Sequence, residues 1–349
     1  MIKPVTSVIM PVYNPGSYLK DAINSVLSQS FRDFEFIIVN DGSNDTSEKV
    51  IKSFSDKRIV YIHNQVNIGQ TNSLNKGIAI AKGEYLARMD ADDISFSDRF
   101  ALQVEYLKNN NRVAVVGAWH QEIDKSNRLV KKCFFSVFPN IKVRLTFSRL
   151  VGWASISHPT AMIRKKVLDE LGPYNSEFYI CQDYDLWLRI IRKYPIENIP
   201  EILLGYRTHD CSLTKRFSSQ TVKEYNQVIL NNLNYYMQGN NAQDKGQLFA
   251  MLCNRPQEKK ADIERLNSIF DAFFSTVFFA EIRGPESEYY LDLRERLKIF
   301  YLPQLLKTHP KKTGKLLLRS LFRYPSTVLS RRFIGVARNL LADISNAGL

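Results

Sequence analysis

The sequence contains little cysteine, has no long apolar run and shows no signal-peptide pattern. Its four cysteines, Cys133, Cys181, Cys211 and Cys253, have no paired spacing of the kind that binds metals. We therefore expect free, inert thiols in a reducing compartment. No window reaches the ~18 uninterrupted apolar residues of a transmembrane helix, and the segment after Met1 is not a secretion signal. These absences predict a cytoplasmic protein.

Glycine-rich nucleotide loops are also missing. Neither the dinucleotide fingerprint G-x-G-x-x-G nor the phosphate loop G-x-x-x-x-G-K-[ST] occurs. A nucleotide bound by this chain would not be held in a glycine cradle, so a metal ion would carry much of the phosphate binding. The same absence disfavours a sugar-nucleotidyltransferase, which needs a glycine-rich activating loop where this chain has residues 11–16.

Acidic residues are absent from one long stretch near the C-terminus. The formal net charge is +13, and residues 296–342 hold eleven Lys and Arg but no Asp or Glu. Basic residues interleaved with apolar ones bind anionic membranes, at about 1 kcal/mol per charge near the surface. We expect this stretch to bind an anionic membrane surface, with a solvated basic face or a nucleic-acid patch as alternatives. No recognisable nucleic-acid-binding motif is present, so nucleic acid is not expected as a partner.

Short apolar runs alternate with amphipathic segments over the first 120 residues. The apolar runs predict strands, and the segments with helical spacing predict helices. The predicted strands are 5–10, 34–39, 58–63, 85–89 and 113–117, and the predicted helices are 17–29, 45–54, 70–81 and 97–109. Pro11 is expected to end the first strand. This order predicts an α/β fold with a mostly parallel, doubly wound sheet.

Three carboxylates, Asp90, Asp92 and Asp93, follow the fourth predicted strand. If the strand continued, Asp90 and Asp92 would point the same way, and they would repel unless a cation or hydrogen bonds lay between them. Mg²⁺ and Mn²⁺ take such oxygen ligands together with substrate phosphates, and parallel sheets bind ligands at this edge. The pattern predicts a metal–phosphate site. The alternative is an acidic turn that caps the next helix, helped by Ser95 or Ser97.

Five motifs in this order resemble the inverting family 2 glycosyltransferases of the GT-A fold. They are MPVYN at 10–14, VNDGS at 39–43, NIG at 67–69, NKG at 75–77 and DADD at 90–93. The resemblance covers about residues 5–215 and implies a Rossmann-like, mostly parallel sheet flanked by helices. Residues 87–93 followed by 116–119 are also similar to bacterial lipooligosaccharide β-1,3-N-acetylglucosaminyltransferases.

The resemblance also implies a domain organisation. A catalytic domain is expected at 1–215, with a donor half at about 1–120 and an acceptor half at about 121–215. The pattern of 216–295 is helical and rich in aromatic residues, which predicts a helical appendage, and 296–349 is expected to be a basic amphipathic tail.

The resemblance implies a uridine-nucleotide pocket for the donor. The residues expected there are Pro11, Tyr13, Asn14, Asp41, Asn67, Gly69, Arg88, Asp90, Ala91 and Asp92. Tyr13 is expected to stack on the base, Asp41 to accept a base N–H, and Asp92 to ligate Mn²⁺ or Mg²⁺ through the diphosphate. Simple packing is the alternative for Tyr13, and a turn is the alternative for Asp41 and Gly42.

Asp183 is the expected catalytic base. An inverting transfer needs a base near the acceptor hydroxyl, and a dry cleft raises the basicity of a carboxylate. Asp183 begins a predicted helix that runs to Tyr194, so an N-cap is the alternative, and the positive helix end would then hold its pKa low. Asp185, on another face of the helix, is the alternative base. The family usually has Glu-Asp where this chain has Gln182 and Asp183, and Gln182 is expected to give support.

Three histidine and aromatic positions complete the expected site. The segment 206–209 resembles the family's Tyr-Arg-x-His, which implies that His209 joins the metal shell or touches the diphosphate, since Mn²⁺ also accepts imidazole. A surface loop histidine is the alternative. His158, Gln182 and Trp187 are expected near the acceptor, and for His158 a packing role is equally expected.

Together these expectations describe a metal-dependent inverting hexosyltransferase. The resemblance implies UDP-N-acetylglucosamine as donor, with galactose or N-acetylgalactosamine left open. The expected acceptor is a hydroxyl of a lipid-linked surface glycan of the lipopolysaccharide, O-antigen or capsule type. Such an acceptor implies a peripheral location on the inner face of the bacterial inner membrane. A non-catalytic, membrane-associated nucleotide-sugar-binding protein is the alternative of another class; the retained Asp90, Asp92 and Asp183 argue against it.

Overall fold

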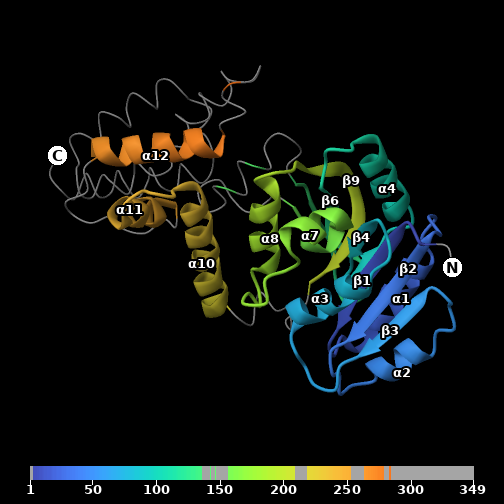
Figure 1. The fold of residues 1–349 in the computed structure, drawn as a ribbon. Coiled ribbons are helices and arrows are strands. Elements are labelled where there is room, and N and C mark those ends of the chain that lie inside the picture. The colour runs from blue at the N-terminus through green and yellow to red at the C-terminus, as the bar shows by residue number, and fades with distance from the viewer. Residues whose placement is uncertain are drawn as a thin grey trace. The chain divides into compact units, whose positions relative to one another are not determined.

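The computed structural model describes residues 3–135, 142, 146, 156–208, 218–252, 263–278 and 283 of the chain (Figure 1). The chain forms two compact units, residues 1–148 with 153–228 and residues 149–152 with 229–349. The elements of the first unit are β1 (Thr6–Val12), η1 (Gly16–Tyr18), α1 (Leu19–Leu27), β2 (Phe34–Asn40), α2 (Ser47–Lys52), β3 (Ile59–His63), α3 (Gln70–Ile80), β4 (Tyr85–Arg88), β5 (Ile94–Ser95), α4 (Arg99–Asn109), β6 (Val115–Ile123), β7 (Leu129–Cys133), η2 (His158–Thr160), β8 (Met162–Arg164), α7 (Lys165–Leu171), α8 (Gln182–Ile191) and β9 (Ile196–Arg207). The helix α10 (Ser218–Tyr236) spans both units, and α11 (Ala242–Leu252) and α12 (Ile263–Val277) belong to the second.

One mixed sheet organises the first unit. Among the described residues its strand order is β3-β2-β1-β4-β8-β6-β9-β5, and β7 pairs with β6. The strands β1 to β4 are parallel, whereas β8 is antiparallel to both of its neighbours, β4 and β6. The predicted parallel core is therefore confirmed, but the fifth predicted strand is the start of β6 and does not pair with β4. β8, which comes later in the chain, lies between them.

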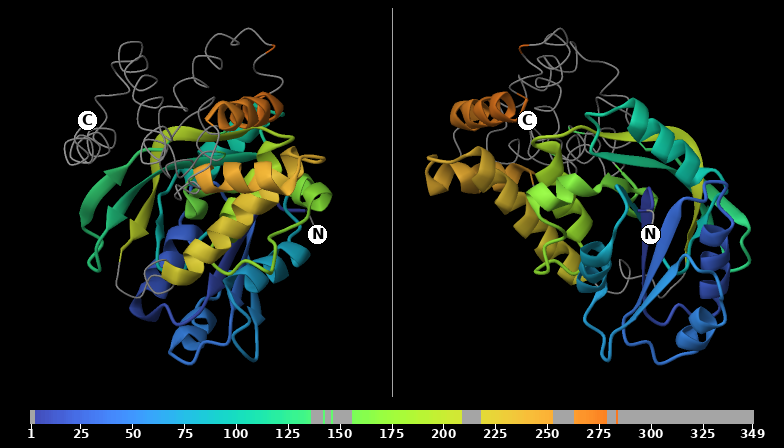
Figure 2. Two further views of the ribbon diagram at one scale, coloured as in Figure 1. Left: turned by 90° about the vertical axis from the view of Figure 1, so that its left-hand side faces the viewer. Right: turned by 45° about the vertical axis from the view of Figure 1, so that its right-hand side comes forward.

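Helices cover both faces of the parallel strands, with α1 and α2 on one face and α3 on the other (Figure 2). Every residue of β1 and β2 is buried, as expected for strands covered on both sides. Val8 and Met10 belong to the same core as Ile23 of α1. On the opposite face, a Cβ at Gly77 of α3 would lie 2.6 Å from Ile9 Cγ2. Alternate side chains of β1 thus pack on opposite faces of the sheet, Val8 and Met10 on one face and Ile9 on the other.

One local prediction about the strand ends was wrong, namely that Pro11 ends the first strand. β1 continues through Pro11 to Val12. The backbone of Ile9 bonds toward β4, since its carbonyl accepts from the Met89 N–H. The backbone of Pro11, two residues later, also faces β4, but it lies beyond the last residue of β1 that pairs with that strand. The missing N–H of Pro11 therefore costs no hydrogen bond of the sheet. β4 ends at Arg88, so Asp90 and Asp92 lie in a turn and not on a strand. That turn does not cap α4, whose N-cap is Asp98.

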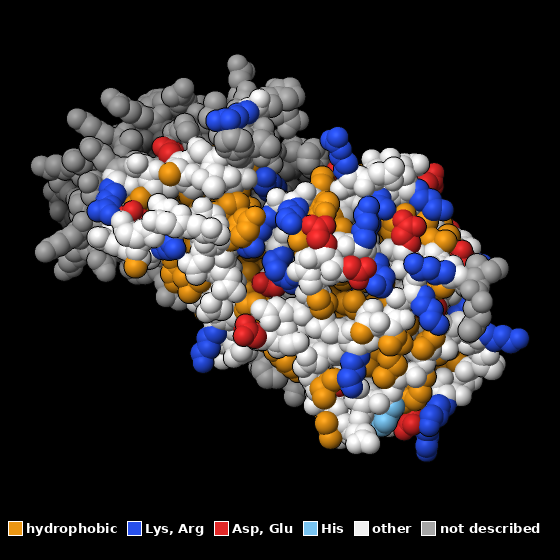
Figure 3. Space-filling model, viewed as in Figure 1, with side chains coloured by type: hydrophobic (Ala, Val, Ile, Leu, Met, Phe, Trp, Pro, Cys, Tyr) orange, Lys and Arg blue, Asp and Glu red, His pale blue; other side chains and the backbone are white. Residues whose placement is uncertain are grey.

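The described part of the second unit is helical. Four of the aromatic residues expected in a packed appendage, Phe270, Phe273, Phe274 and Phe278, are buried, and Phe273 meets Tyr236 edge to face at 6.0 Å between ring centroids. Phe279 and the basic stretch 296–342 lie outside the described residues. Among the helices that are described, none is long and apolar enough to cross a membrane. On the face of the first unit that Figure 3 shows, basic and acidic side chains are interspersed.

Candidate active site

The carboxyl ends of the four parallel strands meet at one edge of the sheet. The loops after β1 and β2 are tied together there, because the Asn14 N–H donates to Ser43 Oγ at 3.1 Å and Asn14 Oδ1 accepts from the Asn44 N–H at 2.9 Å. Asn14 has a positive φ of 49°, which asparagine tolerates better than most residues. Pro11 is buried in β1. The structure therefore gives Asn14 a loop-holding role at this edge.

Tyr13 stands beside this tie with 52% of its surface exposed. Simple packing, the alternative weighed from the sequence, does not describe it. An exposed ring at the carboxyl edge is available as a stacking surface.

Asp41 is 2% exposed and organises the loop after β3. Its Oδ1 accepts from Asn64 Nδ2 at 2.8 Å and from the Ile68 N–H at 2.9 Å, and its Oδ2 accepts from the Gly69 N–H at 2.9 Å. A carboxylate has about four acceptor positions, so one remains on Oδ2. Asn67, whose Oδ1 also accepts from the Gly69 N–H, is exposed beside it.

Two glycines let these loops approach each other. Gly42 has φ +69°, and a Cβ there would lie 2.7 Å from the Val66 carbonyl carbon. Gly69 has φ +90°, and its Cβ would meet the Tyr179 ring at 3.0 Å. At both positions a side chain is disfavoured for two reasons, the positive φ of the backbone and the lack of space for a Cβ. Asp41 and Gly42 do form the turn that the sequence suggested, and that turn supports the site.

The acidic turn after β4 gathers three carboxylates. Asp90, Asp92 and Asp93 each offer an oxygen atom, and these atoms all lie within 4.8 Å of one another. Arg88, at the buried end of β4, forms an ion pair with Asp90 Oδ2. Burial, followed by repulsion from Asp92, raises the pKa of Asp93 well above its ordinary value. Ala91, between Asp90 and Asp92, is buried and has no polar side chain, so the carboxylates of the cluster come from its neighbours Asp90, Asp92 and Asp93.

Arg207 fixes this turn, and the sequence did not identify it as a site residue. Its N–H donates to Asp93 Oδ1 at 2.8 Å and its Nε to the Asp92 carbonyl at 2.7 Å. Its Nη1 donates to the Asp124 carbonyl at 2.7 Å, and its guanidinium lies 4.6 Å from the centroid of the Tyr18 ring. One buried side chain at the end of β9 thus joins the acidic turn to the β6–β7 turn.

The cluster fits a hard divalent cation. Its donors are carboxylate oxygens, which Mg²⁺ and Mn²⁺ prefer. Asp93 Oδ2 is buried and has no hydrogen-bond partner among the described residues. A buried carboxylate oxygen without a partner is costly unless a cation or a proton binds it. His209, the other expected ligand, lies outside the described residues.

A chain of side-chain amides connects the acidic turn to α8. Gln70 Nε2 donates to Asp90 Oδ1 at 3.3 Å, and Gln182 Nε2 donates to Gln70 Oε1 at 3.2 Å. Gln182 is the first residue of α8 and precedes Asp183. The sequence suggested a supporting position for Gln182, but it gave no sign of Gln70, because this pairing joins residues 112 apart.

Asp183 is the second residue of α8, whose N-cap is Cys181, so the N-cap alternative does not apply to it. Its Oδ1 accepts a hydrogen bond from the N–H of the next residue, Tyr184, at 2.7 Å. Burial raises the pKa of Asp183 to about 6, against smaller lowering effects of the Tyr184 N–H and of Arg88. Desolvation by burial therefore outweighs the helix end, which the N-cap alternative expected to hold the pKa low. Asp185 is instead paired with Arg189 at 2.8 Å.

Glu224 of α10 holds the segment that leads into α8. Its carboxylate accepts from the N–H groups of Tyr179 at 3.1 Å, Ile180 at 2.7 Å and Cys181 at 2.9 Å. Three charge-assisted bonds from one 4% exposed carboxylate fix the backbone two residues before Asp183. Glu224 lies 41 residues after Asp183 in a segment without a motif, so no sequence signal could identify it.

Two further expected residues, His158 and Trp187, are buried and pack against each other. His158 Nε2 lies 2.8 Å from Tyr174 Oη, and its ring packs edge to face on Trp187 at 6.0 Å. Burial lowers the pKa of His158 well below its ordinary value. Trp187 is 2% exposed. Both side chains therefore pack the site, and a direct part in acceptor binding stays a prediction.

Comparison with known proteins places this arrangement in a family. The family description "Glycosyl transferase family 2" matches residues 7–172. The chain is 38% identical over 214 residues to the uncharacterized glycosyltransferase MJ1057 of Methanocaldococcus jannaschii, covering 59% of this chain and 72% of that protein. It is 34% identical over 227 residues to the O-antigen biosynthesis glycosyltransferase WbnJ of Escherichia coli, covering 61% and 84%.

A solved structure shares the fold. The crystal structure of S. aureus TarS 1–349 in complex with UDP-GlcNAc superposes with a TM-score of 0.57 over 91% of each chain, at 16% identity. The mixed sheet with its acidic turn after β4 is accordingly a GT-A fold. The chain belongs to glycosyl transferase family 2.

Proposed function

We propose that this glycosyltransferase moves a hexose from a UDP-sugar to a hydroxyl of a lipid-linked surface glycan, with inversion at the anomeric carbon. The observation that carries the proposal is the placement of Asp183. A half-buried carboxylate with a pKa of about 6 is connected through Gln182 and Gln70 to the acidic turn. The residue next to the base and the acidic turn are thus joined by one chain of hydrogen bonds, which helps to hold the base in position relative to the turn.

The donor half supplies the nucleotide contacts. The exposed Tyr13 ring offers a stacking face for the uracil base, and the remaining acceptor position of Asp41 suits a base N–H. Asn67 and Arg88 border the ribose. Asp92, with Asp90 and Asp93 beside it, would hold Mn²⁺ or Mg²⁺. When bound, the cation neutralises charge on the diphosphate of the departing UDP.

The acceptor half supplies the base. Asp183 takes the proton of the attacking hydroxyl, whose oxygen forms a bond to the anomeric carbon while the bond from that carbon to the UDP oxygen breaks. A carboxylate with a pKa near 6 is ionised at pH 7 yet more basic than an ordinary aspartate, which favours proton transfer. His158 and Trp187 are buried and pack against each other, and Trp187 lies on α8, the helix that carries Asp183.

The sugar and the acceptor are the finer parts of the proposal. N-acetylglucosamine is the proposed donor sugar, supported by the resemblance at 87–93 and by the UDP-GlcNAc complex of the TarS structure. A surface glycan is the proposed acceptor, because WbnJ acts in O-antigen biosynthesis. The basic stretch 296–342 is proposed to hold the enzyme on the anionic inner face of the bacterial inner membrane.

A panel of UDP-sugars tests this function. The purified chain is incubated with each donor and Mn²⁺, and UDP release is measured with and without EDTA. We expect metal-dependent release from one donor, UDP-N-acetylglucosamine, and loss of that release in Asp92→Asn. Asp98→Asn, which changes an exposed acid nearby in the chain, is the matched control. Metal-independent release, or donor binding that Asp92→Asn leaves unchanged, would contradict the metal site.

A further inference from the structure

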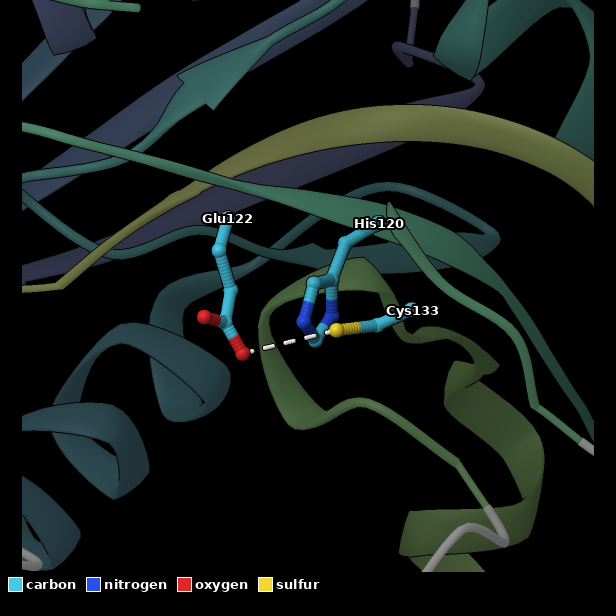
Figure 4. Close-up of side chains that lie close together, drawn as sticks. All are labelled: His120, Glu122 and Cys133. Atoms are coloured by element: carbon cyan, nitrogen blue, oxygen red, sulfur yellow. Dashed lines mark hydrogen bonds between the residues drawn. The ribbon is translucent and has the colours of Figure 1, made fainter. Parts of the chain in front are cut away.

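The β6–β7 hairpin carries a second cluster of metal-ligand side chains. His120 and Cys133 are directly paired across the two strands, and Glu122 lies two residues along β6. Residues two apart on a strand share a face, as do directly opposed residues. His120, Glu122 and Cys133 therefore project from one face of the hairpin and converge (Figure 4), with ligand atoms within 4.8 Å of one another.

From this geometry we propose that His120, Glu122 and Cys133 form a binding site for Zn²⁺ or a similar borderline divalent cation, separate from the acidic turn after β4. Zinc accepts histidine nitrogen, cysteine sulfur and carboxylate oxygen, and sites with three protein ligands leave a fourth position to water or another ligand. The hard cations expected at the acidic turn disfavour thiolate. The two sites therefore select different metals.

The distances suit tetrahedral coordination. A Zn–S bond of ~2.3 Å and a Zn–O bond of ~2.0 Å at a tetrahedral angle separate sulfur and oxygen by about 3.5 Å. Cys133 Sγ and Glu122 Oε1 are 3.5 Å apart. In the metal-free protein the thiol proton bridges these atoms; on binding, the proton leaves to solvent and the cation takes its place between thiolate and carboxylate.

The imidazole is already oriented for binding. His120 stacks on Tyr206 of β9 and packs against Phe135, each at 5.0 Å between ring centroids. Its Nδ1 lies 2.8 Å from Ser157 Oγ. In the tautomer that carries its proton on Nδ1, that proton is donated to the hydroxyl and Nε2 keeps its lone pair for a metal. Hydrogen bonding of the second ring nitrogen is the usual way in which a histidine ligand is fixed.

The cluster is also accessible, since Glu122 and Cys133 are partly exposed while His120 is buried. The bound cation would join β6 to β7 and, through Ser157, to the segment that enters η2. Lys131 is the register partner of Glu122 and lies on the same face. Its positive charge opposes a cation at this site, so the affinity in the native chain is set partly by one removable residue.

Cobalt is the probe for the test, because a Co²⁺–thiolate bond produces near-ultraviolet charge-transfer absorption and an all-oxygen site does not. The full chain is titrated with Co²⁺ in excess Mg²⁺ and a non-thiol reductant. We expect the band in the native protein and in Cys181→Ser, Cys211→Ser and Cys253→Ser, and its loss in Cys133→Ser. Zn²⁺ should abolish the band by competition. No band up to millimolar Co²⁺, or a band that persists in Cys133→Ser, would overturn the site.

Two milder variants separate coordination from folding. Glu122→Gln keeps the side-chain shape and should weaken Co²⁺ binding at least about tenfold, equivalent to ~1.4 kcal/mol. Lys131→Ala should tighten it by roughly three- to tenfold, whereas Lys132→Ala, on the opposite face of the same strand, should leave it unchanged. Equal affinity in Glu122→Gln and the native chain would remove Glu122 and with it the three-ligand site.

Discussion

Replacing Asp183 by asparagine should stabilise the fold while removing the base. The raised pKa means that the folded state disfavours the ionised carboxylate. The difference between a pKa of about 6 and the ordinary 3.8 corresponds to about 3 kcal/mol at neutral pH, since a tenfold change in ionisation is ~1.36 kcal/mol. Because the carboxylate is partly exposed, solvent screening reduces this to about 1–3 kcal/mol. Asparagine keeps the acceptor for the Tyr184 N–H and carries no charge.

The sign of the effect follows from the two pKa values. Below pH 3.8 the carboxyl is protonated in both the folded and the unfolded state, so it does not oppose folding. As the pH rises through about 6 the unfolded state is favoured by its more easily ionised carboxyl, and the stability of the fold decreases. Asp183→Asn should therefore raise the melting temperature by roughly 2–10 °C at pH 7.5, and the gain should shrink as the pH falls toward 4. Differential scanning calorimetry at both pH values, with Asp98→Asn as control, measures this. An equal or lower melting temperature of the variant at pH 7.5 would refute the claim that desolvation of the ionised Asp183 destabilises the fold.

Three further variants test the residues that position the site. Glu224→Gln removes acceptors from the segment before Asp183, so kcat should fall about tenfold or more with the donor KM little changed; an unaltered kcat would contradict the positioning role. Arg207→Lys cannot span the Asp92 and Asp124 carbonyls together, so Mn²⁺ should bind roughly tenfold more weakly in calorimetry; equal affinity would show that the turn holds itself. Gly77→Ala forces a Cβ to 2.6 Å from Ile9, and chemical denaturation should show a loss of about 1–3 kcal/mol, which an unchanged midpoint would exclude.

The sequence predicts the parallel half of the sheet well, because each strand there is a buried run between helices that carry their own periodicity. β5 was not predicted, since two residues provide no pattern. The position of β8 between β4 and β6 depends on pairing across about 75 residues, which no local signal encodes. The prediction for Pro11 was wrong because proline disrupts a strand only where its missing N–H would bond to a neighbouring strand. Pro11 pairs with β2 but has no partner in β4.

At the site, the sequence identifies residues that lie in motifs and misses those that hold them. Gln70, Arg207 and Glu224 act through contacts with residues far away in the chain. The pKa of Asp183 could not be predicted, because helix position and burial act in opposite directions. Cys133 was expected to be a free, inert thiol, and its place beside His120 follows from the register of the β6–β7 hairpin, which no sequence motif encodes.

The most direct test of the proposed mechanism compares UDP release by the native enzyme and by Asp183→Asn at saturating donor and Mn²⁺. The account predicts that the variant binds the donor with unchanged affinity and releases UDP at least ~100-fold more slowly. It also predicts that native activity falls as the pH drops below about 6, where Asp183 takes up its proton. Equal turnover by the two proteins would remove Asp183 from the chemistry and contradict the account.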